Sequence, residues 1–303
     1  MYDYSGLLEL AQTLKCEIVK DFPLSAITSF KVGGPADVLA KPVSADDAIR
    51  LWRWAKQENV KVLILGKASN VLISDQGFKG LVISTGAFKK LELLPGNKIE
   101  CGAGVSLSAL CNFALKNSLT GLEFAYGIPG SAGGAAYMNA GAYGGEMKDV
   151  LVSCKHVEAL KSDFLLGNFS GDELELSYRN SVYKNKPYLI TSLTLQLKQG
   201  EASEIKAKMD DYMHRRIAKQ PLEFPSGGSI FKRPPDDFAG RLIEICGLKG
   251  YSIGGAQVSE KHAGFIINTG KATSKDIKDL ISFVQESVRG KTGVLLETEI
   301  VSI

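Results

Sequence analysis

Hydrophobic residues along this chain recur at two spacings, and the first predicts helices. Behind Ser44, whose hydroxyl can cap a helix with Asp47 three residues on, Leu51 and Ala55 keep helical spacing. We therefore predict a helix over about residues 45–58, another over residues 107–116, and a short one near the N-terminus over about residues 7–14.

The second spacing predicts strands. Residues 61–65 form a continuous apolar run that Gly66 stops, and shorter runs follow at residues 71–73 and 81–84. Residues 150–160 and 189–198 also predict strands, the latter because Leu193 and Leu195 alternate with polar residues. Because helices and strands alternate, we interpret the first two hundred residues as one α+β or α/β domain.

A polar break at residues 199–202 separates this region from a second set of elements. Two helices follow, each with its apolar residues on one face: Ile205, Met209, Tyr212, Met213 and Ile217, then Ile277, Leu280, Ile281, Val284 and Val288. The later helix should open near Thr273 or Ser274 and stop at Gly290, and a strand over residues 293–301 should close the chain. We therefore expect two domains, residues 1–200 and residues 201–303.

The composition is that of a folded globular protein. Of the 303 residues, 45% are hydrophobic and 23% are charged, which excludes disorder as the main state. The formal net charge is only +3 and no long basic run occurs, so we expect neither nucleic acid nor a membrane as a partner. Five scattered cysteines without a CxxC pair predict no metal site and fit reduced thiols. The first twenty residues do not resemble a signal peptide, and we expect a cytoplasmic protein.

Glycine density points to candidate binding loops. Residues 127–145 hold seven glycines, and a second loop, residues 66–70, directly follows a predicted strand. Glycine lets main-chain N–H groups approach an anion, so two such loops suit a large ligand such as a dinucleotide. Any single glycine here is as readily explained by a tight turn. Neither GxGxxG nor a P-loop motif is present.

Seven motifs in order resemble one known family. They are TSFKVGGPA (28–36), SNVLISD (69–75), GLEFAYGIPGS (121–131), YMNAGAY (137–143), YRNS (178–181), GSIFK (228–232) and GGAQVS (254–259). Together they closely resemble the UDP-N-acetylenolpyruvoylglucosamine reductase (MurB) family, over about residues 20–301.

The resemblance implies a fold and an activity. It implies an α+β chain with a PCMH-type (vanillyl-alcohol-oxidase-like) FAD-binding domain, a smaller C-terminal α+β substrate domain, and NADPH as hydride donor. The implied reaction reduces UDP-N-acetylglucosamine enolpyruvate to UDP-N-acetylmuramate in peptidoglycan synthesis. Only 49 residues separate Arg179 from Ser229, which resembles the shorter family type that lacks a substrate-covering insertion. We expect a monomer whose partner is this small-molecule substrate.

The resemblance also assigns site residues. Arg179, Ser229 and Glu299 fall on the catalytic positions. The implied flavin-binding residues are Gly66, Lys67, Ala68, Ser69, Asn70, Gly127, Ile128, Pro129, Gly130, Ser131, Gly133, Gly134, Asn139 and Ala140, and the implied substrate-binding residues are Lys219, Lys232, Arg233 and His262. Three of these depart from the family pattern: Lys67 and Ala68 stand where glycines are usual, and Arg233 stands where Asn is usual.

The chemistry of the three catalytic candidates fits an enol ether reduction. Enolate-like charge gathers on the substrate carboxylate, and the planar, permanently charged guanidinium of Arg179 suits it. The Ser229 hydroxyl, assisted by Lys232, can hand a proton to the strongly basic α-carbon. Glu297 and Glu299 share a strand face, so either could help; the family pattern favours Glu299.

Each assignment has a structural alternative. Outside the family context, Arg179 would be read as a salt-bridge residue, Ser229 as a turn residue and Glu299 as a solvated strand charge. Lys219 is as readily part of a solvated helix face. Two other functions stay open at this point: a PCMH-type oxidase, or a non-catalytic module that binds flavin or a sugar nucleotide.

Overall fold

A computed structural model describes residues 2–161 and 163–303 and divides the chain into two compact units. Unit 1 comprises residues 1–20, 38–67 and 80–214, and unit 2 comprises residues 21–37, 68–79 and 215–303. The units therefore alternate along the chain. The sequence-based boundary at residues 200–201 stays a prediction, because compact units of this kind need not coincide with domains.

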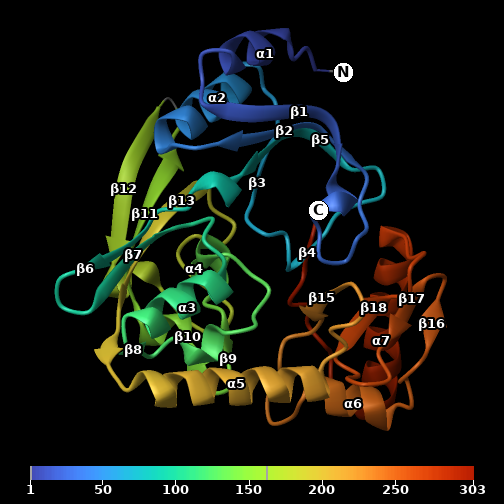
Figure 1. The fold of residues 1–303 in the computed structure, drawn as a ribbon. Helices are drawn as coiled ribbons and strands as arrows, with labels where there is room; N and C mark the ends of the chain where they lie inside the picture. The colour runs from blue at the N-terminus through green and yellow to red at the C-terminus, as the bar shows by residue number, and fades with distance from the viewer. Residues whose placement is uncertain (1, 162) are drawn as a thin grey trace. The chain divides into compact units, whose positions relative to one another are not determined.

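Seven α-helices lie in the described part of the chain (Figure 1). They are α1 (Ser5–Ala11), α2 (Ala45–Gln57), α3 (Leu107–Lys116), α4 (Ala132–Met138), α5 (Ala202–Lys219), α6 (Ala239–Ile245) and α7 (Ser274–Thr292). Ser44 caps α2 as predicted, since its Oγ accepts a hydrogen bond from the Asp47 N–H at 3.1 Å.

Unit 1 is built on a five-stranded sheet in the order β12-β11-β13-β7-β6. Its strands are β6 (Leu91–Leu94), β7 (Lys98–Gly102), β11 (Leu151–Ala159), β12 (Phe164–Ser170) and β13 (Tyr188–Gln196), and every neighbouring pair is antiparallel. Helix α4 packs against β7 and β13, and α3 packs against α4 (Figure 1). Small two-stranded ladders join β8 (Leu119–Thr120) to β14 (Lys198–Gln199) and β9 (Gly141–Ala142) to β10 (Gly145–Glu146).

A second sheet, in the order β1-β2-β5-β3, contains strands that run along the chain from one unit into the other. Its members are β1 (Cys16–Pro23), β2 (Pro35–Pro42), β3 (Val62–Leu65) and β5 (Phe78–Ser84), and β3 pairs with β5 in parallel. Helix α2 presents Ala48, Leu51 and Ala55 to the core of unit 1, and all three are fully buried. The mixture of sheets and helices confirms the α+β class.

Unit 2 has its own hydrophobic core beneath an antiparallel sheet in the order β15-β18-β17-β16. The strands are β15 (Ser226–Ser229), β16 (Ser252–Ile253), β17 (Ala256–Val258) and β18 (Phe265–Asn268), and α7 packs against β16 and β17. The apolar face of α7 forms as predicted, with Ile277, Leu280 and Val284 fully buried. Strand β4 (Val71–Leu72) pairs in parallel with β19 (Val301–Ser302).

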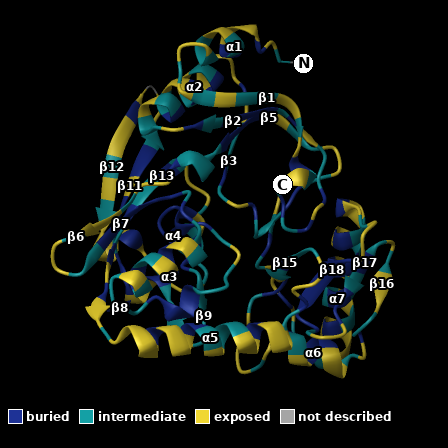
Figure 2. Ribbon diagram, in the orientation of Figure 1, coloured by how far each residue is buried: buried dark blue, intermediate teal, exposed yellow. Residues whose placement is uncertain are grey.

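Two predictions for the second half of the chain are wrong in part. Residues 293–301 do not form one strand, because only β19 and a single bridge between Phe231 and Thr298 make ladder contacts there. Helix α7 continues past Gly290 and ends at Thr292, and Gly293, with a φ of 76°, is its left-handed C-cap. Along α5, Ile205 and Met209 are buried, but Ile217 is exposed, and much of the helix surface is open to solvent (Figure 2).

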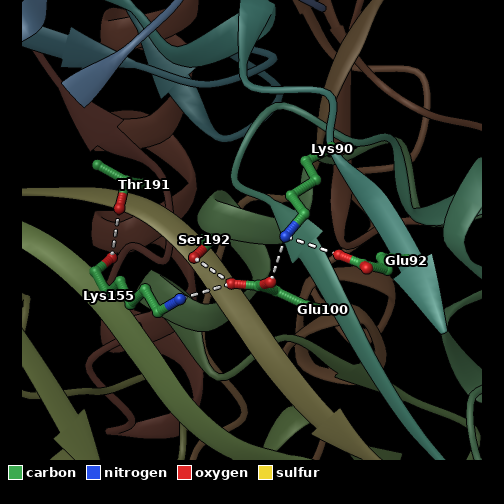
Figure 3. Close-up of polar contacts among 6 residues, drawn as sticks. All are labelled: Lys90, Glu92, Glu100, Lys155, Thr191 and Ser192. Atoms are coloured by element: carbon green, nitrogen blue, oxygen red, sulfur yellow. Dashed lines mark hydrogen bonds and ion pairs between the residues drawn. The ribbon is translucent and has the colours of Figure 1, made fainter. Parts of the chain in front are cut away.

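A charged network lies on the five-stranded sheet of unit 1 (Figure 3). Glu100 on β7 is only 8% exposed and accepts hydrogen bonds from Lys155 Nζ on β11 and Lys90 Nζ, both at 2.7 Å. Lys90 also pairs with Glu92 at 2.7 Å. The hydrogen bonds from Lys155 and then Lys90 hold the pKa of Glu100 below its ordinary value. The folded state therefore favours the charged carboxylate.

We predict that Glu100→Gln lowers the free energy of unfolding at pH 7 by about 1–2 kcal/mol, because the two lysines lose a charged acceptor that is mostly shielded from water. The native pKa lies below the unfolded value of about 4.3, so the contribution is complete above that pH and is lost as pH falls through the native pKa. Urea unfolding at pH 7 and at about pH 3 measures the difference between the two proteins.

Glu92→Gln is the matched control, since Glu92 contacts the same lysine with a side chain that is 51% exposed. We expect a change within about 0.5 kcal/mol for this variant. Equal losses in the two variants, or a Glu100→Gln deficit that persists at low pH, would contradict the role given to Glu100.

Candidate active site

The two loops predicted to bind the cofactor meet within unit 1. Gly66 directly follows β3, and a Cβ atom on it would lie 2.5 Å from the Ser131 Oγ. Ser131 is buried and caps α4, accepting a hydrogen bond from the Gly134 N–H at 3.4 Å. The loops therefore touch at a glycine that leaves no space for a side chain.

The glycine-rich loop is fixed to the segment before α3. The Ala132 N–H donates to the Val105 carbonyl at 2.8 Å, and the Gly133 N–H donates to the Ala103 carbonyl at 2.9 Å. A Cβ atom on Gly133 would lie 2.7 Å from the Ala103 Cβ, so only glycine permits this approach. The glycine at 133 is thus explained by close packing.

The remaining cofactor candidates in unit 1 differ in how open they are. Lys67, Pro129 and Gly134 are exposed, and Gly127, Ile128, Gly130 and Ala140 are partly buried. A loop with a fixed base and partly open glycines fits a pyrophosphate, because main-chain N–H groups can reach the oxygens. These residues therefore fit FAD, whereas Asn139 is completely buried.

Arg179 lies at the tip of a tight hairpin in unit 1. Ser177 and Asn180 exchange two main-chain hydrogen bonds, at 3.2 and 3.1 Å, around Tyr178 and Arg179. Arg179 has a φ of 53°, a left-handed conformation that is uncommon for a residue with a side chain. Its guanidinium lies 5.3 Å from the ring centroid of Tyr178. The main chain thus holds this arginine in a strained position.

In unit 2, a β-bulge presents Ser229. Ser226 pairs with Ile267 and Ser229 pairs with Phe265, so β15 has one more residue than β18 between the two pairs. Gly228 has a φ of 83°, which a residue with a side chain rarely adopts. Ser229 is exposed, as a proton donor to a ligand must be.

The segment that carries Glu299 lies beside the Ser229 segment. The Glu299 N–H donates to the Ile230 carbonyl at 2.7 Å, and the Lys232 N–H donates to the Glu297 carbonyl at 2.8 Å. Lys232 Nζ also contacts Glu297 Oε2 at 2.9 Å, and this lysine lowers the pKa of Glu297. Glu297 is therefore engaged by Lys232, and the main chain of Glu299 is fixed beside Ile230.

The rest of the 66–70 loop belongs to unit 2 and supports Glu299 there. Ala68 is buried with a φ of 49°, and its carbonyl accepts from the Ser29 N–H at 3.2 Å. Ser69 is partly buried. Asn70 Nδ2 donates to the Glu299 carbonyl at 3.2 Å, and the Asn70 carbonyl accepts from Val301 at 3.1 Å. The structure thus gives Asn70 a contact with the proposed catalytic segment that sequence reasoning did not foresee.

The other substrate candidates also lie in unit 2. His262 Nδ1 accepts a hydrogen bond from the Gly264 N–H at 3.1 Å, which leaves Nε2 to carry the proton of the neutral ring. Burial, with the charges of Lys249 and Lys219, lowers the pKa of His262. Lys219 is exposed at the end of α5, and Arg233 stacks over Phe238 at 4.1 Å.

The sequence alone did not reveal that the carboxylate of Asp75 caps helix α7. Asp75 accepts hydrogen bonds from the Ser274 N–H at 2.7 Å and the Lys275 N–H at 3.0 Å, so it caps α7 from a distant part of the chain. Only the three-dimensional fold brings these residues together. Within residues 2–161 and 163–303, no His, Cys, Asp and Glu cluster suitable for a metal ion occurs, and no helix is both long and apolar enough to span a bilayer.

Comparisons with protein families match both parts of the chain. A model of the UDP-N-acetylenolpyruvoylglucosamine reductase C-terminal domain matches residues 220–303. A model described as FAD binding domain matches residues 36–162. The UDP-N-acetylenolpyruvoylglucosamine reductase of Caldanaerobacter subterraneus subsp. tengcongensis is 49% identical over 278 residues, which cover 92% of this chain and 91% of that protein.

Solved structures show the same likeness. The crystal structure of UDP-N-acetylenolpyruvylglucosamine reductase (MurB) from Thermus caldophilus is 33% identical, has a TM-score of 0.79, and matches over 95% of this chain and 99% of that chain. The structure of 6-hydroxy-D-nicotine oxidase from Arthrobacter nicotinovorans is 16% identical with a TM-score of 0.51, over 94% of this chain and 62% of that chain. The latter likeness concerns the fold alone, and it agrees with the PCMH-type architecture.

We predict that Gly133→Ala weakens FAD binding about tenfold or more, because the new methyl group forces α4 away from Ala103 and distorts the loop. Fluorescence titration of the flavin-free protein with FAD measures the dissociation constant. Gly290→Ala is the control, since a Cβ atom there would meet nothing within 4 Å. Unchanged FAD affinity in Gly133→Ala would contradict the role proposed for the glycine-rich loop in binding FAD.

Proposed function

Because this chain belongs to the UDP-N-acetylenolpyruvoylglucosamine reductase (MurB) family, we propose that Arg179, Ser229 and Glu299 are its catalytic residues. The protein is a FAD-dependent oxidoreductase that uses NADPH to reduce UDP-N-acetylglucosamine enolpyruvate to UDP-N-acetylmuramate, a reaction of peptidoglycan synthesis. FAD, when bound in the loops at residues 66–70 and 127–140, would supply the two-electron redox chemistry that connects NADPH with the substrate double bond. The protein supplies binding, charge stabilisation and a proton.

The presentation of Ser229 is the observation that carries this assignment. The bulge at Gly228 shifts the ladder register just before Ser229, which pairs with Phe265 and lies next to the segment that holds Glu299. A serine hydroxyl is a weak acid in water, but a correctly placed hydroxyl can protonate a strongly basic carbon. Glu299 would orient this hydroxyl or replenish its proton.

Arg179 would stabilise the charge that develops on the substrate. When the double bond gains electron density, enolate-like charge gathers on the carboxylate, and a guanidinium can bind both of its oxygens. The rigid hairpin reduces the reorganisation needed at that moment. The substrate-binding roles proposed for Lys219, Lys232, Arg233 and His262 rest on the family resemblance. Cations and a neutral imidazole N–H are suitable donors to a diphosphate.

The proposed assembly is a monomer that works in the cytoplasm. All five cysteines are unpaired, and burial raises the pKa of Cys101 and of Cys111 to about 12, which keeps these thiols protonated. Free thiols are typical of a reducing compartment.

Light scattering should give a mass near 32.6 kDa for the proposed monomer. A value of twice that mass would overturn the monomer.

We predict that Ser229→Ala leaves reduction of the flavin by NADPH intact and slows its reoxidation by the enolpyruvyl sugar nucleotide about 10²- to 10⁴-fold, the usual range for general acid catalysis. Anaerobic stopped-flow absorbance separates the two half-reactions, and steady-state kinetics should be ping-pong. Ser252→Ala, which alters an exposed serine of the same unit, is the control. Wild-type reoxidation in Ser229→Ala would refute the proton-donor role, and rapid reoxidation by oxygen would favour an oxidase.

A further inference from the structure

The side chain of Asn139 is fully hydrogen-bonded inside unit 1. Nδ2 donates to Glu146 Oε2 at 2.7 Å and to the Ser177 carbonyl at 2.9 Å, and Oδ1 accepts from the Lys148 N–H at 2.9 Å. The partners fix the orientation of the amide, because a carboxylate and a carbonyl accept while an N–H donates. Both N–H bonds of the amide are therefore in use.

This arrangement argues against a direct contact between the Asn139 side chain and the cofactor. The residue is 0% exposed, and its amide has no remaining donor to offer. Its φ of 43° makes it the left-handed C-cap of α4. The asparagine instead joins the end of the glycine-rich helix to Ser177, the first residue of the hairpin that carries Arg179.

The hairpin is anchored on its other side as well. Ser181 Oγ donates to the Tyr137 carbonyl at 2.8 Å and accepts from the Tyr183 N–H at 3.3 Å. Tyr183 is 1% exposed, and its hydroxyl contacts His156 Nδ1 at 3.0 Å. Arg179 thus sits between two anchors, which can hold its left-handed conformation despite the strain.

We propose that Asn139 is a positioning residue for Arg179, an inference that rests on the proposed catalytic role of that arginine. The Asn139 amide ties the main chain of Ser177 to the helix end that follows the glycine-rich loop. It thereby fixes the hairpin tip relative to the loop that binds FAD. Displacement of a charge-stabilising group by about 1 Å can cost 10²-fold in rate, so this single amide has a catalytic consequence without touching the substrate.

Asn139→Asp tests the proposal with almost no change in shape. The new carboxylate faces the Ser177 carbonyl and Glu146, both acceptors, so the tie to the hairpin is lost. We expect flavin reoxidation by the sugar nucleotide to slow at least tenfold, while FAD content and flavin reduction by NADPH stay within twofold. Asn117→Asp is the matched control, because it removes an amide hydrogen bond to Phe113 in the same unit but away from the hairpin.

A double-mutant cycle with Arg179→Ala separates positioning from general damage. If Asn139 acts through the guanidinium, Asn139→Asp should slow reoxidation less than twofold further when Arg179 is already absent. Full additivity of the two losses would overturn the proposal. Loss of FAD from Asn139→Asp would also overturn it, because the residue would then serve the cofactor. Normal reoxidation in Arg179→Ala alone would instead refute the proposed function.

If Asn139→Asp does not fold, a second variant still tests whether the hairpin must be anchored. Ser181→Ala removes only the opposite anchor, and it should slow reoxidation with the same lack of additivity toward Arg179→Ala. Hydrogen exchange of residues 174–184 in the flavin-free protein gives a readout independent of turnover. It should accelerate in Asn139→Asp or Ser181→Ala and stay unchanged in Asn117→Asp; protection equal to wild type would contradict the anchoring.

Discussion

Main-chain polar groups in irregular segments need hydrogen-bond partners, and this constraint acts on the candidate site residues within each unit. Side chains from distant parts of the sequence add to the partners that main-chain hydrogen bonds supply. In unit 1 the Ser177 carbonyl accepts from Asn139, and in unit 2 the Glu299 carbonyl accepts from Asn70. In unit 2, Asn268 Nδ2 likewise donates to the Phe30 carbonyl at 2.9 Å. These amides hold loops that would otherwise have many conformations.

Regular elements with strong local signals were predicted well from the sequence. The predicted and observed bounds of α3 agree at both ends, and those of α2 differ by one residue. Capping residues such as Ser44 act within a single turn, so the local sequence is enough to predict where such a helix begins. The apolar face of α7 was also correct, since one repeated spacing decides it. The chain end at residues 293–301 failed for the opposite reason. An apolar run can form a strand only where another segment pairs with it. In this region such pairing occurs only at β19 and at the bridge between Phe231 and Thr298.

The candidate site was predictable only as a set of residue types and motifs. The family resemblance named Arg179, Ser229 and Glu299, but nothing local in the sequence predicts that Arg179 adopts a left-handed φ. Nor does a Gly-Gly-Ser sequence specify a bulge, because the extra residue is defined by its pairing with Phe265 and Ile267. Such features depend on partners far along the chain, which is why single-sequence reasoning could not supply the geometry.

Glycine density in the 127–145 loop illustrates how two explanations can hold at once. The sequence left a choice between tight turns and close approach to an anion. Neither explanation alone accounts for Gly133. The absence of a side chain at this position lets α4 lie against Ala103. That contact also sets the base of the loop, so packing and ligand approach depend on the same absent methyl group. The sequence motif is therefore best understood as an anchored loop, in which the buried Gly133 fixes the base and, in the proposed site, the more open glycines would face the cofactor.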